Sequence, residues 1–578
     1  METKKILARS CLFWFSLFFI LGIGTVNSQN NFVRVNQIGY YANAPKIAIL
    51  ANMDAVDYEI RDVSTREVVF HGNVADGAHW RQSGEKLQVV DFSDFKKPGK
   101  YFIKSSTEQS YPFEIKDSAL FDQLSVWSLK AFYLWRASTE IKPEYATFGK
   151  TVYSRALGHP DDVVYIHVSA ATEKRHVESE VSAPKGWYDA GDYNKYVVNA
   201  GISFHSLALA YEMYPDYYKR LNLNIPESGN GVPDILNEMK WELDWLFNMQ
   251  DEDGSVYTKL TTLKFSKMVM PAHDKADRYM VGKSTPAALN FAAMMAMASR
   301  IYAKYDSIFP GLSAKALTAA EKSWNWAVKH PKMEYTNPKD VRTGEYGDGE
   351  FSDEFFWAAS ELFITTKNVK YFNELQFYQK FDTPSWRFVN SLGIMSLALH
   401  KKELESLVDV SQIDNRFRSL SENIYKQYVY SPSRVPISKY EWGSNSVIAQ
   451  NGTILGLAYF LTNETRYRDG MLSSFDYLLG TNPTDYCFVT RFGSHYPRNL
   501  HDRRSSACGI AEPMPGYLVG GANPENVADC GRRNYPSSQP ARCYLDKDCS
   551  FSTNEIAINW NAPFALLVGM VENTFGKK

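Results

Sequence analysis

Two aspartates and a distant glutamate are the side chains in this sequence whose types and spacing best suit chemistry. Asp189 and Asp192 lie three residues apart around a glycine in GWYDAGDYNKY (186–196), among aromatic residues. Carboxyl groups at this spacing can face one water molecule, so that one removes its proton while the other holds it. Alone, the pattern is also typical of a cap, a turn or a calcium ligand. A base of this kind therefore needs a partner acid elsewhere in the chain.

Glu555 is the candidate partner acid. It precedes an apolar helical pattern in YLDKDCSFSTNEIAINWNAPFA (544–565), with Tyr544 and Trp560 near it in sequence. Apolar and aromatic surroundings raise the pKa of a carboxyl group and keep it protonated, as a general acid requires. The alternative is a favourable charge in the first turn of the helix. Asp546 is placed to orient this acid or to bind substrate.

A third element, RFGSHYPRNLHDRRSS (491–506), is dense in His and Arg. In an extended loop His501 and Arg503 point to the same side, where they can donate hydrogen bonds to hydroxyl groups or pair with a carboxylate. The alternative is a solvated basic loop.

Short β-branched and aromatic runs, separated by turn residues, fill the chain from residue 31 to 116. About seven such strands predict an immunoglobulin-like β-sandwich. The runs are FVRV (32–35), KIAIL (46–50), YEIRD (58–62), EVVF (67–70), LQVVDF (87–92), KYFIKS (100–105) and YPFEI (111–115).

From residue 118 to 578 the apolar residues recur at helical spacing, which predicts a large all-α domain with long loops that carry the chemistry. The expected helices include PDILNEMKWELDWLFNMQ (233–250), STPAALNFAAMMAMASRIYAKY (284–305), DEFFWAASELFITT (353–366), SLGIMSLALHKKEL (391–404), SVIAQNGTILGLAYFLT (446–462), MLSSFDYLLG (471–480) and EIAINWNAPFALLVGMVENTF (555–575).

Residues 1–28 have the pattern of a secretory signal peptide, because an apolar run from Cys11 to Val26 follows three basic residues. The alternative is an uncleaved anchor, since the run is near the lower length limit for spanning a bilayer. We expect a secreted, periplasmic or cell-surface protein with no membrane span in the mature chain. The remaining five cysteines predict one or two disulfides or, as an equal alternative, reduced buried thiols: Cys487, Cys508, Cys530, Cys543 and Cys549.

The overall charge argues against nucleic acid as a partner. The chain of 578 residues has 63 basic and 65 acidic residues and a formal charge of −2. Binding to a polyanion needs a basic surface that this balance does not supply. We expect a monomer.

The combination and order of these elements resemble glycoside hydrolase family 9, the inverting β-1,4-glucanases of the cellulase type. RVNQIGYYANAPKIAIL resembles the start of the immunoglobulin-like domain that precedes many members, and GWYDAGDYNKYVVNAG resembles their base motif. GSHYPRNLHDRRSS and YLDKDCSFSTNEIAINWNAP resemble the two signatures near the C-terminus. The resemblance implies an (α/α)6 barrel after the sandwich, with a cleft at one end.

The resemblance also implies the roles of individual residues. Asp192 is the expected base, Asp189 the helper that holds the water, and Glu555 the acid. His501, Arg503 and Asp546 match positions that bind the sugar near the scissile bond or support the acid. In an inverting enzyme the base and the acid stand roughly 6.5–9.5 Å apart on opposite faces of the sugar.

No cofactor is expected for the chemistry, but relatives hold structural metals. Some bind zinc through Cys and His before the base motif, where this chain has three histidines and no cysteine, so zinc is doubtful: His159, His167 and His176. The acidic loop 344–355 offers Asp348, Glu350 and Asp353 as ligands for calcium. The alternative is a solvated loop. Most aromatic residues are expected in the core, and the candidates for stacking on sugar rings are Trp187, Trp357, Trp386 and Trp442.

The expected substrate is a β-glucan polysaccharide or oligosaccharide cleaved in the endo mode, with a xyloglucan-specific or exo-acting hydrolase as the alternative within the family. Two other classes compete. A noncatalytic glycan-binding protein gives no reason for the three acids. A terpene cyclase also uses an α-barrel with clustered aspartates, but export away from isoprenoid diphosphates argues against it.

Overall fold

The computed structural model describes residues 32–576. The predicted signal peptide and Cys11 lie outside the described residues. Within residues 32–576 no helix combines the length and the apolar character that crossing a bilayer demands.

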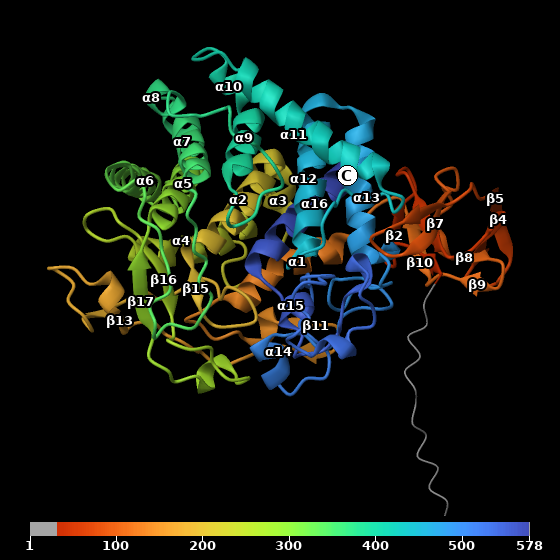
Figure 1. Cartoon of the computed structure of the whole chain (residues 1–578), viewed down its shortest axis with the longest axis horizontal. Coiled ribbons are helices and arrows are strands. Elements are labelled where there is room, and N and C mark those ends of the chain that lie inside the picture. The colour runs from red at the N-terminus through yellow and green to blue at the C-terminus, as the bar shows by residue number, and fades with distance from the viewer. Residues whose placement is uncertain (1–31, 577–578) are drawn as a thin grey trace, which may run out of the picture. The chain divides into compact units, whose positions relative to one another are not determined.

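The N-terminal part is the predicted immunoglobulin-like β-sandwich (Figure 1). One sheet has the order β1-β3-β7-β6, and the other has the order β2-β10-β8-β4-β5 with β9 beside β8. Buried residues of both sheets, such as Leu50, Ile60 and Ile103, form a common core. Each of the seven predicted runs overlaps a strand. The strands are β1 (Val33–Arg34), β2 (Gly39–Tyr41), β3 (Ile47–Ala51), β4 (Asp57–Asp62), β5 (Val68–Asn73), β6 (Ala78–Trp80), β7 (Glu85–Asp91), β8 (Gly99–Ser105), β9 (Glu108–Gln109) and β10 (Phe113–Lys116).

Six helices that contact one another in a closed ring form the inside of an (α/α)6 barrel. They are apolar around most of their circumference, because each one packs against its two neighbours in the ring and against an outer helix. The inner helices are α2 (Val197–Met213), α5 (Thr285–Tyr302), α7 (Ser352–Thr366), α9 (Asn390–Leu399), α12 (Ser444–Thr462) and α16 (Ile558–Phe575).

An outer helix covers each inner one and returns the chain, so the N-terminal ends of the inner helices meet at one end of the barrel. The outer helices are α1 (Asp122–Trp135), α4 (Asp234–Met249), α6 (Leu312–Lys329), α8 (Val369–Phe372), α11 (Ser411–Tyr430) and α13 (Thr465–Asp476). The described part of the chain has four further short helices: α3 (Pro215–Arg220), α10 (Lys401–Leu404), α14 (Arg503–Ala507) and α15 (Phe551–Asn554).

The helical domain also contains a small sheet that the expectation of an all-α domain left out. Its order is β14-β13-β17-β16-β15, and its strands are too short to give a clear alternating pattern. The strands are β13 (Val164–Ile166), β14 (Glu180–Val181), β15 (Lys195–Tyr196), β16 (Tyr257–Thr261) and β17 (Tyr279–Lys283); β11 (Thr147–Phe148) and β12 (Thr151–Val152) form a separate pair.

The sandwich is bound to the barrel through buried polar contacts and a shared apolar core. Asn36 Nδ2 donates to Asp476 Oδ1 over 2.7 Å, and the Tyr41 hydroxyl donates to Glu572. The amide oxygen of Gln37 accepts from two main-chain N–H groups of the loop at 494–495, at 3.0 and 2.8 Å. Trp80 and Leu87 of the sandwich belong to the main core of the barrel.

Candidate active site

The candidate catalytic residues lie in segments that immediately precede inner helices. Asp189 and Asp192 come before α2, Tyr346 comes before α7, and Glu555 comes before α16. Because the N-terminal ends of the inner helices meet, these segments converge at one end of the barrel. The residues are therefore neighbours in the folded protein although they are far apart in the sequence.

Asp189 and Asp192 are 2% and 6% exposed and are held by different partners. Asp189 Oδ2 accepts from the Tyr346 hydroxyl at 2.8 Å, and its Oδ1 accepts from Asn199 Nδ2. Burial, and next the charge of Asp192, raise the pKa of Asp189 to about 8, although both donors act in the opposite direction. Asp189 therefore keeps a proton more readily than an ordinary aspartic acid.

Asp192 is held at both carboxylate oxygens by Asn194. The main-chain N–H of Asn194 donates to Oδ1 at 3.1 Å, and its side-chain Nδ2 donates to Oδ2 at 3.0 Å. The carboxylate is thus fixed within its own turn, in an orientation that does not depend on substrate.

Glu555 lies outside any helix. Its backbone is extended, and it pairs with His501 in an isolated parallel bridge, while α16 begins only at Ile558. The alternative of a favourable charge in a first helical turn is therefore wrong. Burial, and then the charges of Asp192 and Asp189, raise the pKa of Glu555 well above its ordinary value. This carboxyl group is suited to carry a proton at neutral pH.

His501 and Arg503 hold the loops around the two acids. His501 Nδ1 contacts the carbonyl of Asp548 at 2.6 Å, and burial lowers the pKa of this imidazole. The guanidinium of Arg503 donates to the carbonyls of Gly191 and Ser266, both at 2.9 Å. Because α14 begins at Arg503, the extended segment expected to carry both side chains ends before it.

Asp546 supports the loop that leads to the acid. Its carboxylate accepts from the main-chain N–H groups of Arg498 and Asn499, at 2.9 and 2.8 Å, and from Asn554 Nδ2 at 3.0 Å. Asn554 directly precedes Glu555, so Asp546 acts on the acid through this neighbour.

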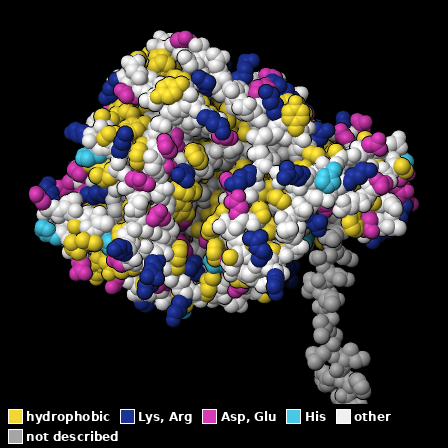
Figure 2. Space-filling model, viewed as in Figure 1, with side chains coloured by type: hydrophobic (Ala, Val, Ile, Leu, Met, Phe, Trp, Pro, Cys, Tyr) yellow, Lys and Arg dark blue, Asp and Glu magenta, His cyan; other side chains and the backbone are white. Residues whose placement is uncertain are grey.

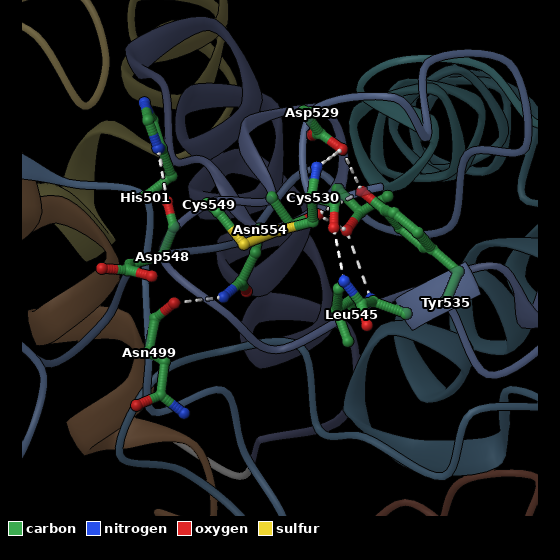
Figure 3. The surroundings of a disulfide bond; sticks show 12 residues. Asn499, His501, Asp529, Cys530, Tyr535, Leu545, Asp548, Cys549 and Asn554 are labelled. Carbon is green, nitrogen blue, oxygen red and sulfur yellow. Dashed lines mark hydrogen bonds between the residues drawn. A yellow bond between two sulfur atoms is a disulfide. The ribbon is translucent and has the colours of Figure 1, made fainter. Parts of the chain in front are cut away.

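A disulfide joins the same region. Cys530 and Cys549 are bonded, and Cys549 follows Asp548, whose carbonyl contacts His501 (Figure 3). This confirms the expectation of one or two disulfides near the C-terminus. The other described cysteines are free, and two of them are buried: Cys487, Cys508 and Cys543.

Gly191 allows the segment that carries Asp189 and Asp192 to pack closely against the loop that carries His501. A Cβ atom at this glycine would lie 2.1 Å from the His501 carbonyl oxygen, which no side chain tolerates. The carbonyl of Gly191 in turn accepts from the main-chain N–H of Arg503 at 3.1 Å. The two loops are therefore in main-chain contact.

Two of the four tryptophans expected to stack on sugars are core residues. Trp187 and Trp357 are 1% and 0% exposed, because the first packs on Phe132 and the second lies in the middle of the inner helix α7. Trp386 is partly exposed and contacts Tyr346 edge-on at 5.0 Å. Trp442 is 44% exposed and lies 5.5 Å from the ring of Phe551.

The histidines considered for zinc have protein partners. His159 contacts the Tyr188 hydroxyl at 2.8 Å, His167 contacts Asp340 at 3.1 Å, and His176 is exposed. Across residues 32–576 no three or more His, Cys, Asp and Glu side chains are grouped so that they could hold a metal ion by themselves.

Sequence reasoning missed Tyr346, Asn194 and Asn199. Tyr346 lies in the acidic loop that was considered only for calcium, and its place between two glycines was the available signal. Asn194 is part of the quoted base motif. Asn199 lies inside α2, where nothing in the sequence sets it apart.

The fold and this cluster of carboxyl groups define the class of the protein as a glycoside hydrolase. The profile of Glycosyl hydrolase family 9 matches residues 121–568, and that of the Cellulase N-terminal ig-like domain matches residues 28–110. The chain belongs to glycosyl hydrolase family 9, as the resemblance of its motifs predicted.

Known proteins of this family are similar over nearly the whole chain. A xyloglucan-specific endo-beta-1,4-glucanase of Bacteroides ovatus, BoGH9A, is 39% identical over 94% of each chain. Endoglucanase D of Acetivibrio thermocellus is 32% identical over 92% of this chain and 81% of its own length. A solved structure, described as Bacteroides ovatus GH9, superposes with a TM-score of 0.86 at 37% identity and covers 94% of this chain and 99% of its own.

Proposed function

We propose that this glycoside hydrolase cleaves internal β-1,4-glucosidic bonds of cellulose-like glucans with inversion of configuration. The observation that carries the proposal is the cluster of three carboxyl groups, Asp189, Asp192 and Glu555, whose charges act on one another. One of them, Glu555, has a raised pKa, and another, Asp192, is fixed by two donors. A protonated Glu555 can act as the general acid, and an ionised Asp192 can act as the general base.

The reaction proceeds in one displacement. Asp192 takes a proton from a water molecule, whose oxygen attacks the anomeric carbon from the face opposite the leaving group. Glu555 gives its proton to the glycosidic oxygen as the bond from that oxygen to the anomeric carbon breaks. Asp189, held by Tyr346 and Asn199, positions the water. His501 binds the sugar, while Arg503 and Asp546 hold the base loop and the acid loop.

An aromatic strip beside the site supports a sugar polymer as the ligand. Trp442 and Phe551 are exposed and adjacent, and the Phe551 ring lies 5.7 Å from that of His501. Aromatic faces of this kind stack on the apolar faces of pyranose rings. The visible surface mixes both signs of charge, which fits a neutral polymer better than a polyanion (Figure 2).

Xyloglucan is the second candidate substrate. It is favoured by the relative BoGH9A, which its name describes as xyloglucan-specific and which matches almost the full length of this chain. Comparing initial rates on xyloglucan, mixed-linkage glucan and carboxymethyl cellulose separates the two candidates. A fast loss of viscosity relative to new reducing ends identifies endo cleavage.

The first product should carry an α-configured reducing end. Attack by water from the opposite face of a β-linked glucan inverts the anomeric carbon, and no glycosyl-enzyme forms. Proton NMR of a fresh digest, recorded before mutarotation, should show the α signal rising first. Asp192→Asn should abolish this signal, and Asp189→Asn should only weaken it. Early appearance of the β anomer would mean retention and would overturn the proposed mechanism.

We propose calcium as a structural ion at the acidic loop, with a changed set of ligands. Glu350 is exposed, whereas Asp348 Oδ2 and both carboxylate oxygens of Glu354 are buried without a hydrogen-bond partner among the described residues. Burial, and next the charge of Asp353, raise the pKa of Glu354 well above its ordinary value. A cation bound by Asp348 and Glu354, with carbonyl oxygens and water as its other ligands, would compensate these charges.

Chelation should lower the thermal midpoint by about 2–5 °C, and added calcium should restore it. The difference should grow as the pH rises, because a carboxyl group with a raised pKa in the folded state costs stability once it loses its proton. Differential scanning calorimetry with EGTA and calcium measures this. Glu354→Gln should remove the calcium response, and the exposed control Glu350→Gln should keep it. One tightly held zinc per chain by elemental analysis would contradict the expectation for zinc.

We further propose that the protein is exported through residues 1–28 and acts as a monomer at or outside the cell surface. The disulfide Cys530–Cys549 supports export, because such bonds persist in oxidising compartments. The proposed division into residues 31–116 and 118–578 falls between β10 and α1.

A further inference from the structure

The base Asp192 stands at the end of a buried chain of hydrogen bonds that none of the proposed roles uses. The chain begins at Asn194, which is 2% exposed. Asn194 Oδ1 accepts from Thr262 N at 3.1 Å and from Thr261 Oγ1 at 2.9 Å. Since a main-chain N–H can only donate, this contact fixes which end of the amide is oxygen. The Nδ2 group must therefore face Asp192, to which it donates.

The chain continues across the small sheet to a buried cation. Thr261 Oγ1 is 2.8 Å from Thr343 Oγ1, and Lys259 Nζ donates to Thr343 Oγ1 at 3.3 Å. Lys259 is 0% exposed and also donates to Asn337 Oδ1 and to the carbonyl of Gly344, at 2.6 and 2.8 Å. Burial lowers the pKa of Lys259 to about 7, and the negative charge of Asp192 opposes this.

The register of the sheet puts these groups in place. Strand β15 pairs with β16 so that Lys195 is opposite Leu260 and Tyr196 is opposite Lys259. Asn194, one residue before β15, is thereby brought beside Thr261 and Thr262. A sheet of short strands in a helical domain thus fixes the residue that holds the base.

We propose that Asn194 is the positioning residue of the base, and that Lys259 and Thr261 orient it through this chain of hydrogen bonds. The inference rests on the proposed role of Asp192. Thr261 Oγ1 has one hydrogen and is also 2.8 Å from the carbonyl oxygen of Thr262, so this hydrogen is shared between that carbonyl and Asn194 Oδ1. In either case the main-chain N–H of Thr262, which can only donate, keeps the Asn194 oxygen turned away from Asp192. These contacts fix the Asn194 amide, and the amide in turn holds the carboxylate of Asp192 through its Nδ2 group.

The acidic limb of the kcat/KM profile is the property that this chain controls. Replacing Asn194 changes none of the titratable side chains whose charge interacts with that of Asp192, which include Asp189, Tyr196, Lys259, His501 and Glu555. A change in the limb on replacing Asn194 therefore reports the loss of its amide.

The test compares Asn194→Ala and Thr261→Val with the wild type on a soluble β-glucan. Loss of one donor to a carboxylate should move the acidic limb up by about one to two pH units for Asn194→Ala, and less for Thr261→Val. For Asn194→Ala, kcat should fall by about 10- to 100-fold with KM nearly unchanged, because substrate contacts remain.

Thr258→Val is the matched control. Thr258 lies on the same strand, is also buried, and donates to Ser284 Oγ at 3.2 Å, outside the chain. It should lower the thermal midpoint about as much as Thr261→Val and leave the pH profile unchanged. If Asn194→Ala does not fold, the test is the pH profile of Thr261→Val compared with that of Thr258→Val.

Different results would refute the role of the chain of hydrogen bonds and the proposed function. If Asp192→Asn is inactive but the acidic limbs of Asn194→Ala and Thr261→Val coincide with that of the wild type, the role of the chain of hydrogen bonds is refuted and the proposed function stands. If Asp192→Asn keeps its activity, the proposed function itself falls.

Discussion

Replacing Glu555 by Gln should lower kcat on a β-1,4-glucan by about 10²–10⁴-fold and leave substrate binding and the fold nearly unchanged. Glutamine has the size of the acid but no proton for the leaving oxygen. In the wild type, burial and then the charges of Asp192 and Asp189 raise the pKa of Glu555 well above its ordinary value, which favours the protonated form. Steady-state kinetics on an unactivated glucan, with thermal melting as the check on folding, measure the effect.

A substrate with an activated aryl leaving group is the control for this variant, because its departure needs little protonation. Its hydrolysis should be reduced much less. The rate on an ordinary glucan should fall as the pH rises through the pKa of Glu555, and Glu555→Gln should lose this basic limb. A variant that keeps more than about a tenth of wild-type turnover on the unactivated glucan would refute the assignment.

Removing the sandwich, residues 32–116, should lower the thermal midpoint of the barrel by at least about 10 °C or leave it insoluble. Asp476 and Glu572 are 2% and 7% exposed in the intact protein and would lose their partners Asn36 and Tyr41. The apolar surface now covered by Trp80 and Leu87 would face water. Solubility, light scattering and calorimetry of the truncated chain measure this.

A single substitution provides the graded comparison. Gln37→Ala removes the acceptor of the main-chain N–H groups of Ser494 and His495, which are exposed and half-buried, at a cost of about 0.5–1.5 kcal/mol for each lost hydrogen bond. It should lower the midpoint less than the truncation does. A soluble barrel with an unchanged midpoint and unchanged kcat would show that the sandwich is an independent appendage.

The elements of the sandwich and the long helices were predictable because their signals are local. An alternating strand such as β4 and an apolar helix such as α5 each carry their pattern within one window of the sequence. Strand β15 was not predictable, because two residues cannot show an alternation and its pairing with β16 depends on the closed fold.

The residues of the candidate site were also predictable only where their signal is local in the sequence. The acids were found because their motifs are dense in chemistry, and the family resemblance gave them roles. Tyr346 and Lys259 were missed, because each acts on an aspartate that is far away in the chain and close only after folding. Trp357 was misjudged because a tryptophan in the core and one on a sugar-binding surface look alike in a sequence.

The contact at Gly191 has a consequence for engineering. Gly191 directly precedes the proposed base Asp192 and packs against the carbonyl of His501, which pairs with the proposed acid Glu555. The gap between base and acid is therefore set by main-chain atoms, as by a spacer of fixed length, and not by adjustable side chains. A retaining variant, which requires a shorter gap, is out of reach of a single substitution. The segments 187–194, 499–503 and 554–557 would have to be transplanted together, as one cassette.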